Sequence, residues 1–280
     1  MESCAVGEVS GVGVSGGLDG VMRWVIPAIL LLLAGFTLFL RAWRLNSIPP
    51  WLWADEAAQG LNARDLLTGH LQAFFPRGMG QEPFYAYLTT PFVAAWDGQP
   101  FAVRIVAALL SALMVLALYL AARALWRDRP YAGVWAGVAA AGFWATNFWP
   151  QSMGRIGFQV NTLPLILTLA VVFWLCYTQQ PTRRRAITFG LLAGLTMATY
   201  LAARITPVLW ILLYLALPKP KRQLLRTTLP WARWLAHSVP APKASPVAAT
   251  SSVLVGLPLS GSIRVIVPSP VFATQTEPAA

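Results

Sequence analysis

Apolar stretches long enough to cross a membrane alternate with polar stretches along most of this chain. The stretch 24–40 holds no charged residue, lies between Arg23 and Arg41, and at about 1.5 Å per residue roughly matches a bilayer core. Five more apolar stretches follow, the last two of them short, at 105–122, 131–149, 156–178, 186–201 and 205–217. A stretch of about thirteen residues at 84–96 suits an interfacial or re-entrant helix better than a span. The pattern predicts an all-α fold, a polytopic transmembrane helical bundle of about six spans.

The two ends of the chain lack this pattern. Residues 1–21 are rich in Gly, Ser and Val, and residues 230–280 are punctuated by prolines without a helical period. Segments of this composition bury too little apolar surface to fold, so we expect a disordered N-terminus. We expect the tail to be disordered as well, or to be the non-native end of a truncated reading frame. The membrane-embedded core is then 22–229.

Composition supports the membrane assignment. Of the 280 residues, 57% are hydrophobic and only 11% are charged, whereas an ordinary soluble domain has roughly 25% charged residues. The net charge of +11 could suggest nucleic acid as a partner, but the basic residues are dispersed between apolar stretches. This placement favours topology signals and contacts with anionic membrane lipids, and it argues against a nucleic-acid-binding face.

Basic residues cluster in alternate polar stretches. Clusters lie at 123–129, 183–185 and 219–226, whereas the short stretches between them hold only Arg155 and Arg204. The positive-inside rule therefore predicts a cytoplasmic N-terminus and an extracytoplasmic first loop, which carries the short interfacial helices.

This first loop carries two adjacent carboxylates, Asp55 and Glu56. Prolines at 49–50 force an extended entry, and acidic residues suit the first turn of the helix that follows. At about 100° per residue, Asp55, Gln59 and Asn62 fall on one face of that helix for two turns. A carboxylate pair beside the bilayer surface can carry acid–base chemistry. The plainer alternative is that both acids only cap the helix.

Four short motifs occur in order along the chain. They are WADEA at 53–57, EPFYAYL at 82–88, FAVRIVAAL at 101–109 and GRIGF at 154–158. In order and spacing, over roughly residues 22–217, they resemble the GT-C class of membrane glycosyltransferases. Close relatives within that class are the protein O-mannosyltransferases and the aminoarabinose transferases that modify lipid A.

The resemblance implies a polyprenyl-phosphate-linked sugar donor in the membrane. It implies transfer of a hexosyl or pentosyl group, with inversion, to an acceptor hydroxyl on the extracytoplasmic face, and it suggests a prokaryotic plasma membrane. Asp55 would act as the general base, and Glu56 would support it or bind a metal. A divalent metal stays open, because some branches of the class use one and others do not.

The departing phosphate needs fixed cations, and arginines of the outer loops are the candidates. Arg155 and Arg204 are the first choices, and Arg64 is a further candidate. Tyr200 would share a face with Arg204 in a continuous helix, because the two are four residues apart. The alternative for Arg155 and Arg204 is a role as interfacial anchors, which is also how we interpret Arg104.

Two features depart from the class. Glu82 stands where a basic residue is expected, and we interpret it, with Gln59, as an acceptor contact or an ordinary loop residue. The chain also ends after about six spans, where such enzymes usually have eleven or more, which indicates an N-terminal portion. Two other functions stay open: a membrane transporter or lipid-translocating protein, and an inactive fragment of the transferase.

Overall fold

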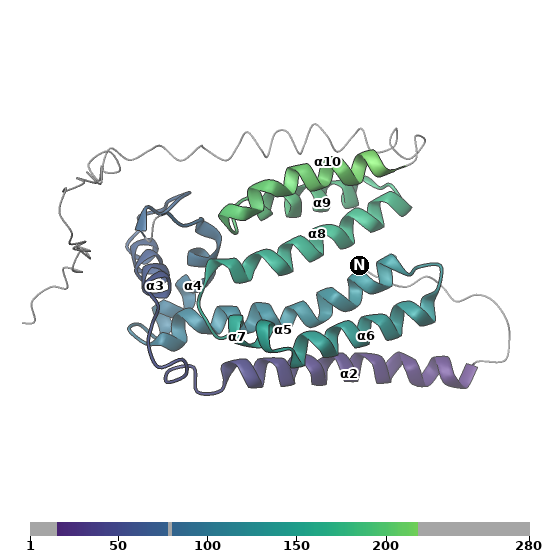
Figure 1. The fold of residues 1–280 in the computed structure, drawn as a ribbon, viewed down its shortest axis with the longest axis horizontal. Coiled ribbons are helices and arrows are strands. Elements are labelled where there is room, and N and C mark those ends of the chain that lie inside the picture. Colours follow the sequence, from purple (N-terminus) through teal and green to yellow (C-terminus); the bar gives the residue numbers. More distant parts are fainter. Residues whose placement is uncertain (1–15, 78–79, 218–280) are drawn as a thin grey trace, which may run out of the picture. The chain divides into compact units, whose positions relative to one another are not determined.

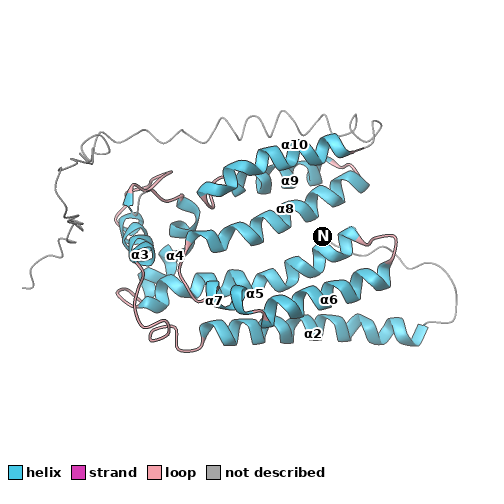
Figure 2. Cartoon of the chain, in the orientation of Figure 1, coloured by secondary structure: helices cyan, strands magenta, loops and turns pink. Residues whose placement is uncertain are grey.

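A computed structural model describes residues 16–77 and 80–217 of the chain. All of these residues belong to the first of the two compact units into which the chain divides, Met1–Lys243. Within the described ranges the regular structure is helical, without a β-strand and with one isolated bridge between Phe75 and Gln81 (Figure 2). The prediction of an all-α fold is confirmed.

Six helices follow one another back and forth (Figure 1). They are α2 (Gly16–Ala42), α5 (Pro100–Leu125), α6 (Pro130–Thr146), α8 (Thr162–Gln179), α9 (Arg183–Thr196) and α10 (Thr206–Ala216). Three described segments are long and apolar enough to cross a membrane: Met22–Ala42, Pro100–Leu125 and Gln159–Gln179. The other three helices are shorter, with 17, 14 and 11 residues, so the count of six spans stays a prediction.

One end of the bundle gathers the short helices and the connecting segments 43–77, 80–99, 147–161 and 197–205, and we call it the loop end. The short elements there are α3 (Ala54–Leu67), α4 (Pro83–Ala95), α7 (Phe148–Met153), η2 (Gln159–Asn161) and η3 (Leu201–Ile205). The helix α4 has 13 residues and coincides with the apolar stretch at 84–96. Hydrogen bonds join the segments, for example from the Phe84 amide to the Ala198 carbonyl at 3.2 Å.

Prolines set several of the helix starts. Pro83, Pro100 and Pro130 are the first residues of α4, α5 and α6. Proline suits this position because its fixed φ is helical and the amide hydrogen that it lacks would have no partner inside the helix. Pro207 likewise lies in the first turn of α10, so it begins that helix.

The helix α5 lies at the centre of the bundle and packs against α2, α4, α6 and α8. Small residues allow close approach: a Cβ atom at Gly137 of α6 would lie 3.1 Å from the Cα atom of Tyr119 of α5. The outer face of α2 exposes large apolar side chains, with Leu31 74% and Leu32 72% exposed. An apolar face of this size suits lipid and not water.

Element boundaries differ from the sequence pattern in two places. The helix α2 begins at Gly16, inside the segment 1–21 that the sequence predicts to be disordered, and the predicted tail 230–280 lies outside the described residues. Between α9 and α10, Tyr200 has extended backbone and precedes the 3₁₀ turn η3. Tyr200 and Arg204 therefore do not lie on one continuous α-helix, and the shared face expected for them is not formed.

Candidate functional site

The two adjacent carboxylates of the first loop face different surroundings. Both lie in the first turn of α3, where the helix dipole stabilises negative charge. Glu56 is completely buried, and one of its oxygens accepts a hydrogen bond from the Trp53 amide at 3.1 Å, which holds the start of the helix. Asp55 is exposed. Of the pair, only Asp55 is open to a reactant.

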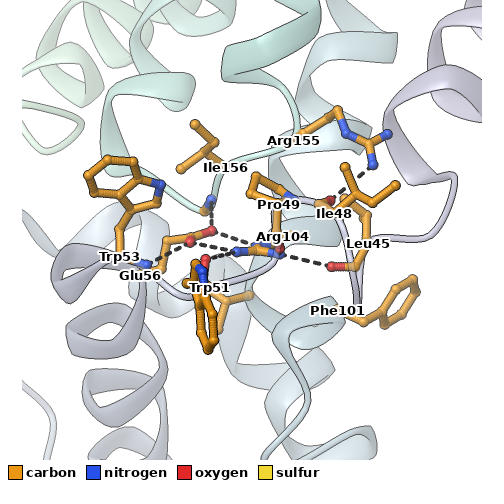
Figure 3. A network of polar contacts seen from close by, with 12 residues as sticks. Leu45, Ile48, Pro49, Trp51, Trp53, Glu56, Phe101, Arg104, Arg155 and Ile156 are labelled. Atoms are coloured by element: carbon orange, nitrogen blue, oxygen red, sulfur yellow. Dashed lines mark hydrogen bonds and ion pairs between the residues drawn. The ribbon is translucent and has the colours of Figure 1, made fainter.

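Glu56 forms a buried cluster with Arg104 of α5 (Figure 3). The guanidinium binds the carboxylate in a bidentate manner, from Nε to Oε1 at 2.8 Å and from Nη2 to Oε2 at 2.9 Å. Its other N–H groups donate to the carbonyl oxygens of Leu45, Pro49 and Trp51. The cluster thus ties the segment between α2 and α3 to the start of α5.

The hydrogen-bonding capacity of this cluster is fully used. Arg104 has five N–H donors, and each has an acceptor. The carboxylate of Glu56 has about four acceptor positions, and they receive two bonds from Arg104, one from Trp53 and one from the Gly157 amide at 2.7 Å. Glu56 has no lone pair left for a proton or a metal, which argues against the direct role that we expected for it.

Arg155 holds the end of α2. Its two terminal nitrogens donate to the carbonyl oxygens of Leu40, Arg41, Trp43 and Ile48. Burial lowers the pKa of Arg155, and the nearby charge of Arg104 lowers it further. Its donors already serve the protein backbone, so a phosphate would have to displace those bonds. This geometry argues against Arg155 as a direct phosphate ligand.

A second polar group surrounds the start of α3 and α4. Gln81 donates from Nε2 to the backbone oxygen of Asp55 at 3.4 Å and accepts from Asn62 Nδ2 at 2.9 Å. Gln59 is buried, donates to Gln159 of η2 at 3.3 Å, and has an Oε1 without a partner among the described residues. The predicted face of α3 is therefore split, since Gln59 and Asn62 point inward and Asp55 is exposed.

Glu82 and Arg204 form a looser ion pair than Glu56 and Arg104. Glu82 Oε1 lies 3.5 Å from Arg204 Nη2, and the two side chains are 5% and 46% exposed. Glu82 Oε2 is buried and has no partner among the described residues. Tyr200, at the start of η3, is half-buried. Among the predicted cations, Arg204 is thus the one that keeps donors available at the loop end.

Arg64 lies away from this group. It forms a bidentate pair with Asp97, at 2.6 and 2.8 Å, and both side chains are about half exposed. The hydrogen bond and the charge of Asp97 raise the pKa of Arg64. Arg64 is in the last turn of α3 and Asp55 in the first, roughly 13 Å apart along the helix axis. The structure does not bring Arg64 together with Asp55.

Two residues of the site are missed by sequence reasoning. Arg104, which we interpret from the sequence as an interfacial anchor, is completely buried. Tyr85 of α4 is also buried and donates to the Val103 carbonyl at 2.7 Å, and burial together with the charge of Glu56 raises its pKa. A signal for Arg104 was present, because a charge one turn inside an apolar helix needs a buried partner.

Two further features bear on ligands. An apolar cavity of about 260 Å³ lies between α5, α7 and α8, with Leu110, Met114, Met153 and Leu165 in its wall. None of the predicted site residues lines it, and its lining suits hydrocarbon. In the described part of the chain, no three His, Cys, Asp or Glu residues are grouped as a metal site would require.

Comparison with known proteins supplies the family. The model of the family described as dolichyl-phosphate-mannose-protein mannosyltransferase matches residues 80–242, more than half of the chain. The matched segment includes Glu82, Arg104, Arg155 and Arg204 and begins after Asp55. No curated protein matches the chain. The chain has helices that can cross a membrane, and it matches a family of membrane glycosyltransferases. It is therefore an integral membrane protein that belongs to the dolichyl-phosphate-mannose-protein mannosyltransferase family.

Proposed function

We propose that this protein transfers a sugar from a polyprenyl-phosphate-linked donor to an acceptor hydroxyl on the extracytoplasmic face of the membrane. The observation that carries the proposal is the contrast between Asp55, exposed in the first turn of α3, and Glu56, which is buried and saturated directly beside it. The family name supports the donor class, since it describes a sugar carried on dolichyl phosphate and transferred to protein. The basic clusters support the extracytoplasmic face for the loop end.

Asp55 acts as the general base in this mechanism. Its carboxylate accepts the proton of the acceptor hydroxyl as the hydroxyl oxygen attacks the anomeric carbon of the sugar. The bond from that carbon to the phosphate oxygen breaks, and polyprenyl phosphate leaves with the electron pair. Attack opposite the leaving group inverts the configuration at the anomeric carbon.

The Glu56–Arg104 cluster positions the base. It fixes the first turn of α3 relative to α5 through Arg104. It also fixes that turn relative to the connecting segment 147–161, which we call the second loop, through the amide of Gly157. Catalysis of this kind depends on reacting groups held within a few tenths of an ångström, so a rigid support next to Asp55 is expected to raise the rate. Glu56 contributes through geometry and does not touch the reactants.

Arg204 is the cation that we assign to the donor phosphate. Its side chain is 46% exposed, and its ion pair with Glu82 at 3.5 Å leaves several N–H groups for a ligand. Arg155 and Arg64 are weaker candidates because carbonyl oxygens and Asp97 already occupy their donors. The apolar cavity between α5, α7 and α8 offers space for part of the prenyl chain.

Asp55→Asn tests the proposal, since asparagine keeps the size of the side chain and cannot take up the proton. The measurement is the transfer of labelled mannose from dolichyl-phosphate and undecaprenyl-phosphate donors to protein and lipid acceptors in proteoliposomes. We expect the rate to fall roughly a hundred-fold to ten-thousand-fold, as for loss of a general base.

Asp97→Asn is the matched control, because Asp97 is an exposed acid of the same loop with a partner of its own. It should transfer at the parent rate. Equal rates in the parent and Asp55→Asn would remove Asp55 from its role. Absence of transfer by the parent with every donor would contradict the function for this chain and favour the inactive-fragment alternative.

A further inference from the structure

Glu82 is a buried carboxylate with too few partners. One oxygen has a single contact, with Arg204 at 3.5 Å, and the other has none among the described residues. Burial of a charged group normally requires close ion pairing and hydrogen bonds to its remaining lone pairs, as Glu56 has. A carboxylate that is 5% exposed and half-satisfied is therefore a site where a ligand can supply the missing donors.

The local backbone does not account for this side chain. Glu82 is the N-cap of α4, where an acidic side chain usually accepts a hydrogen bond from the first turn of the helix. No such bond is present, and the Phe84 amide, one of the two that an N-cap side chain usually binds, donates instead to the carbonyl of Ala198. Glu82 is thus free of the plain capping role that its position suggests.

The residue that precedes Glu82 contacts the segment that carries the proposed base. This residue, Gln81, donates to the backbone oxygen of Asp55 at 3.4 Å, and consecutive Cα atoms lie about 3.8 Å apart. One turn after Asp55, Gln59 is buried and also has an acceptor oxygen without a partner in the described ranges. One unsatisfied acceptor thus lies on α3 itself, at Gln59, and another on the residue that follows Gln81, at Glu82.

The ligand chemistry follows from the charges. Unsatisfied acceptor oxygens need hydroxyl or amine donors, and the adjacent Arg204 needs an anion. A sugar linked through its anomeric carbon to phosphate carries hydroxyl groups within a few bonds of a negative charge. An acid and an arginine 3.5 Å apart match that arrangement, whereas the hydroxyl of a protein acceptor would offer no phosphate for Arg204.

We propose that Glu82 binds the hydroxyl groups of the sugar being transferred, while Arg204 beside it binds the donor phosphate. Glu82 is then a specificity-determining residue, which distinguishes the sugar-loaded lipid from the bare polyprenyl phosphate that remains after transfer. The inference rests on the proposed function and deepens it, because it assigns the recognition of the sugar to a residue other than the base. It also gives a role to the acid that replaces the basic residue expected at this position.

The test compares the binding of two lipids to the full chain in nanodiscs of neutral phospholipid. The probes are dolichyl-phosphate-mannose and dolichyl phosphate, and the readout is the dissociation constant from intrinsic tryptophan fluorescence. We expect the parent to bind the mannose-bearing lipid more tightly. Glu82→Gln should weaken binding of that lipid roughly ten-fold to a hundred-fold, since it removes a charge-assisted hydrogen bond to the sugar, and it should not weaken binding of dolichyl phosphate. Arg204→Gln should weaken both lipids.

Two controls separate this inference from a structural role and from the function itself. Glu82→Gln should unfold at or above the parent temperature, because it removes an underpaired buried charge, and a clear fall would show that Glu82 serves the fold and overturn the inference. Asp55→Asn should bind both lipids like the parent. Equal weakening of both lipids by Glu82→Gln, or of neither, would overturn the inference alone. A parent that binds neither lipid would overturn the proposed function with it.

Discussion

Two glutamate–arginine pairs lie at the loop end of the bundle, and they differ in how fully their hydrogen bonds are satisfied. The Glu56–Arg104 pair is completely buried, bidentate at 2.8 and 2.9 Å, and bonded by every remaining donor and acceptor. The Glu82–Arg204 pair has one contact at 3.5 Å, a half-exposed arginine and an oxygen without a partner in the described residues. The first arrangement stabilises the fold, and the second leaves capacity for a ligand.

The same distinction separates the two neighbouring acids of the first loop. Asp55 and Glu56 are equivalent in the sequence as members of one acidic motif. In the helix they point about 100° apart, so one faces α5 and the other is exposed. The buried acid fixes the position from which the exposed acid can act.

The largest expected effect comes from breaking the saturated pair. Arg104→Met removes the guanidinium and leaves Glu56 buried without its counterion and three carbonyl groups without donors. We expect a loss of about 3–5 kcal/mol in the free energy of unfolding, as for other broken buried pairs. Unfolding in one fixed detergent, followed by tryptophan fluorescence, measures it.

Arg204→Met is the matched control for this comparison. Its side chain is half exposed and its ion pair is long, so we expect a clearly smaller loss of stability than for Arg104→Met. If both variants lost the same amount of stability, saturation of hydrogen bonds would not distinguish the two pairs, and the assignment of one to the fold and the other to a ligand would be contradicted.

A smaller effect is expected from Gly157, whose amide donates to Glu56 at 2.7 Å. A Cβ atom at this position would lie 2.6 Å from Val103 Cγ1 and 3.1 Å from the Val103 backbone oxygen. Gly157→Ala must therefore push the second loop away from α5 and stretch the bond to Glu56. Overpacking of this kind costs about 1–3 kcal/mol, and transfer should slow with it because Asp55 depends on the same support.

Gly142→Ala provides the reference for that substitution. No atom lies within 4 Å of a Cβ built there, and the position is inside α6. Alanine should be neutral or stabilise the helix by up to about 1 kcal/mol. A Gly157→Ala protein as stable and as active as Gly142→Ala would show that the second loop does not hold the base.

Much of the fold follows from the sequence because it depends on local pattern. Apolar stretches of membrane length and prolines at helix starts locate α2, α5 and α8, and the short stretch 84–96 locates α4. The first helical turn at Asp55 follows from the prolines and acids around it. Each of these features is set by residues close together in the chain.

The partners of the arginines could not be predicted in the same way. In the sequence, each of Arg104, Arg155 and Arg204 borders an apolar stretch, so an interfacial anchor was the interpretation of Arg104 and the alternative to phosphate binding for the other two. Their hydrogen-bond partners lie 48 to 122 residues away in the sequence; Arg104 binds Glu56, and Arg204 binds Glu82. The expected shared face of Tyr200 and Arg204 depends on a continuous α-helix. The extended backbone of Tyr200 and the turn η3 interrupt that helix.

The smallest effect is expected from a third pair, Arg64–Asp97, which combines good geometry with exposure. Its distances of 2.6 and 2.8 Å are as short as the 2.8 and 2.9 Å of the buried cluster, yet both side chains are at least half exposed. The hydrogen bond from Arg64 holds the pKa of Asp97 below its ordinary value of 3.8. The pair therefore adds stability above that value and loses it as the pH falls through the lower pKa of the folded state.

Asp97→Asn removes this contribution and measures it. The variant should be slightly less stable than the parent at neutral pH, and the difference should vanish once the pH falls below the lowered pKa of Asp97. It should also vanish on raising the salt to about 1 M, where the Debye length is roughly 3 Å. A difference that persists in acid or in high salt would mean that Asp97 acts through something other than its charge. A difference as large as that of Arg104→Met would mean that short distances alone give a pair its strength. A small stability difference for Asp97→Asn would instead show that the Glu56–Arg104 pair is strong because it is buried and its hydrogen bonds are saturated.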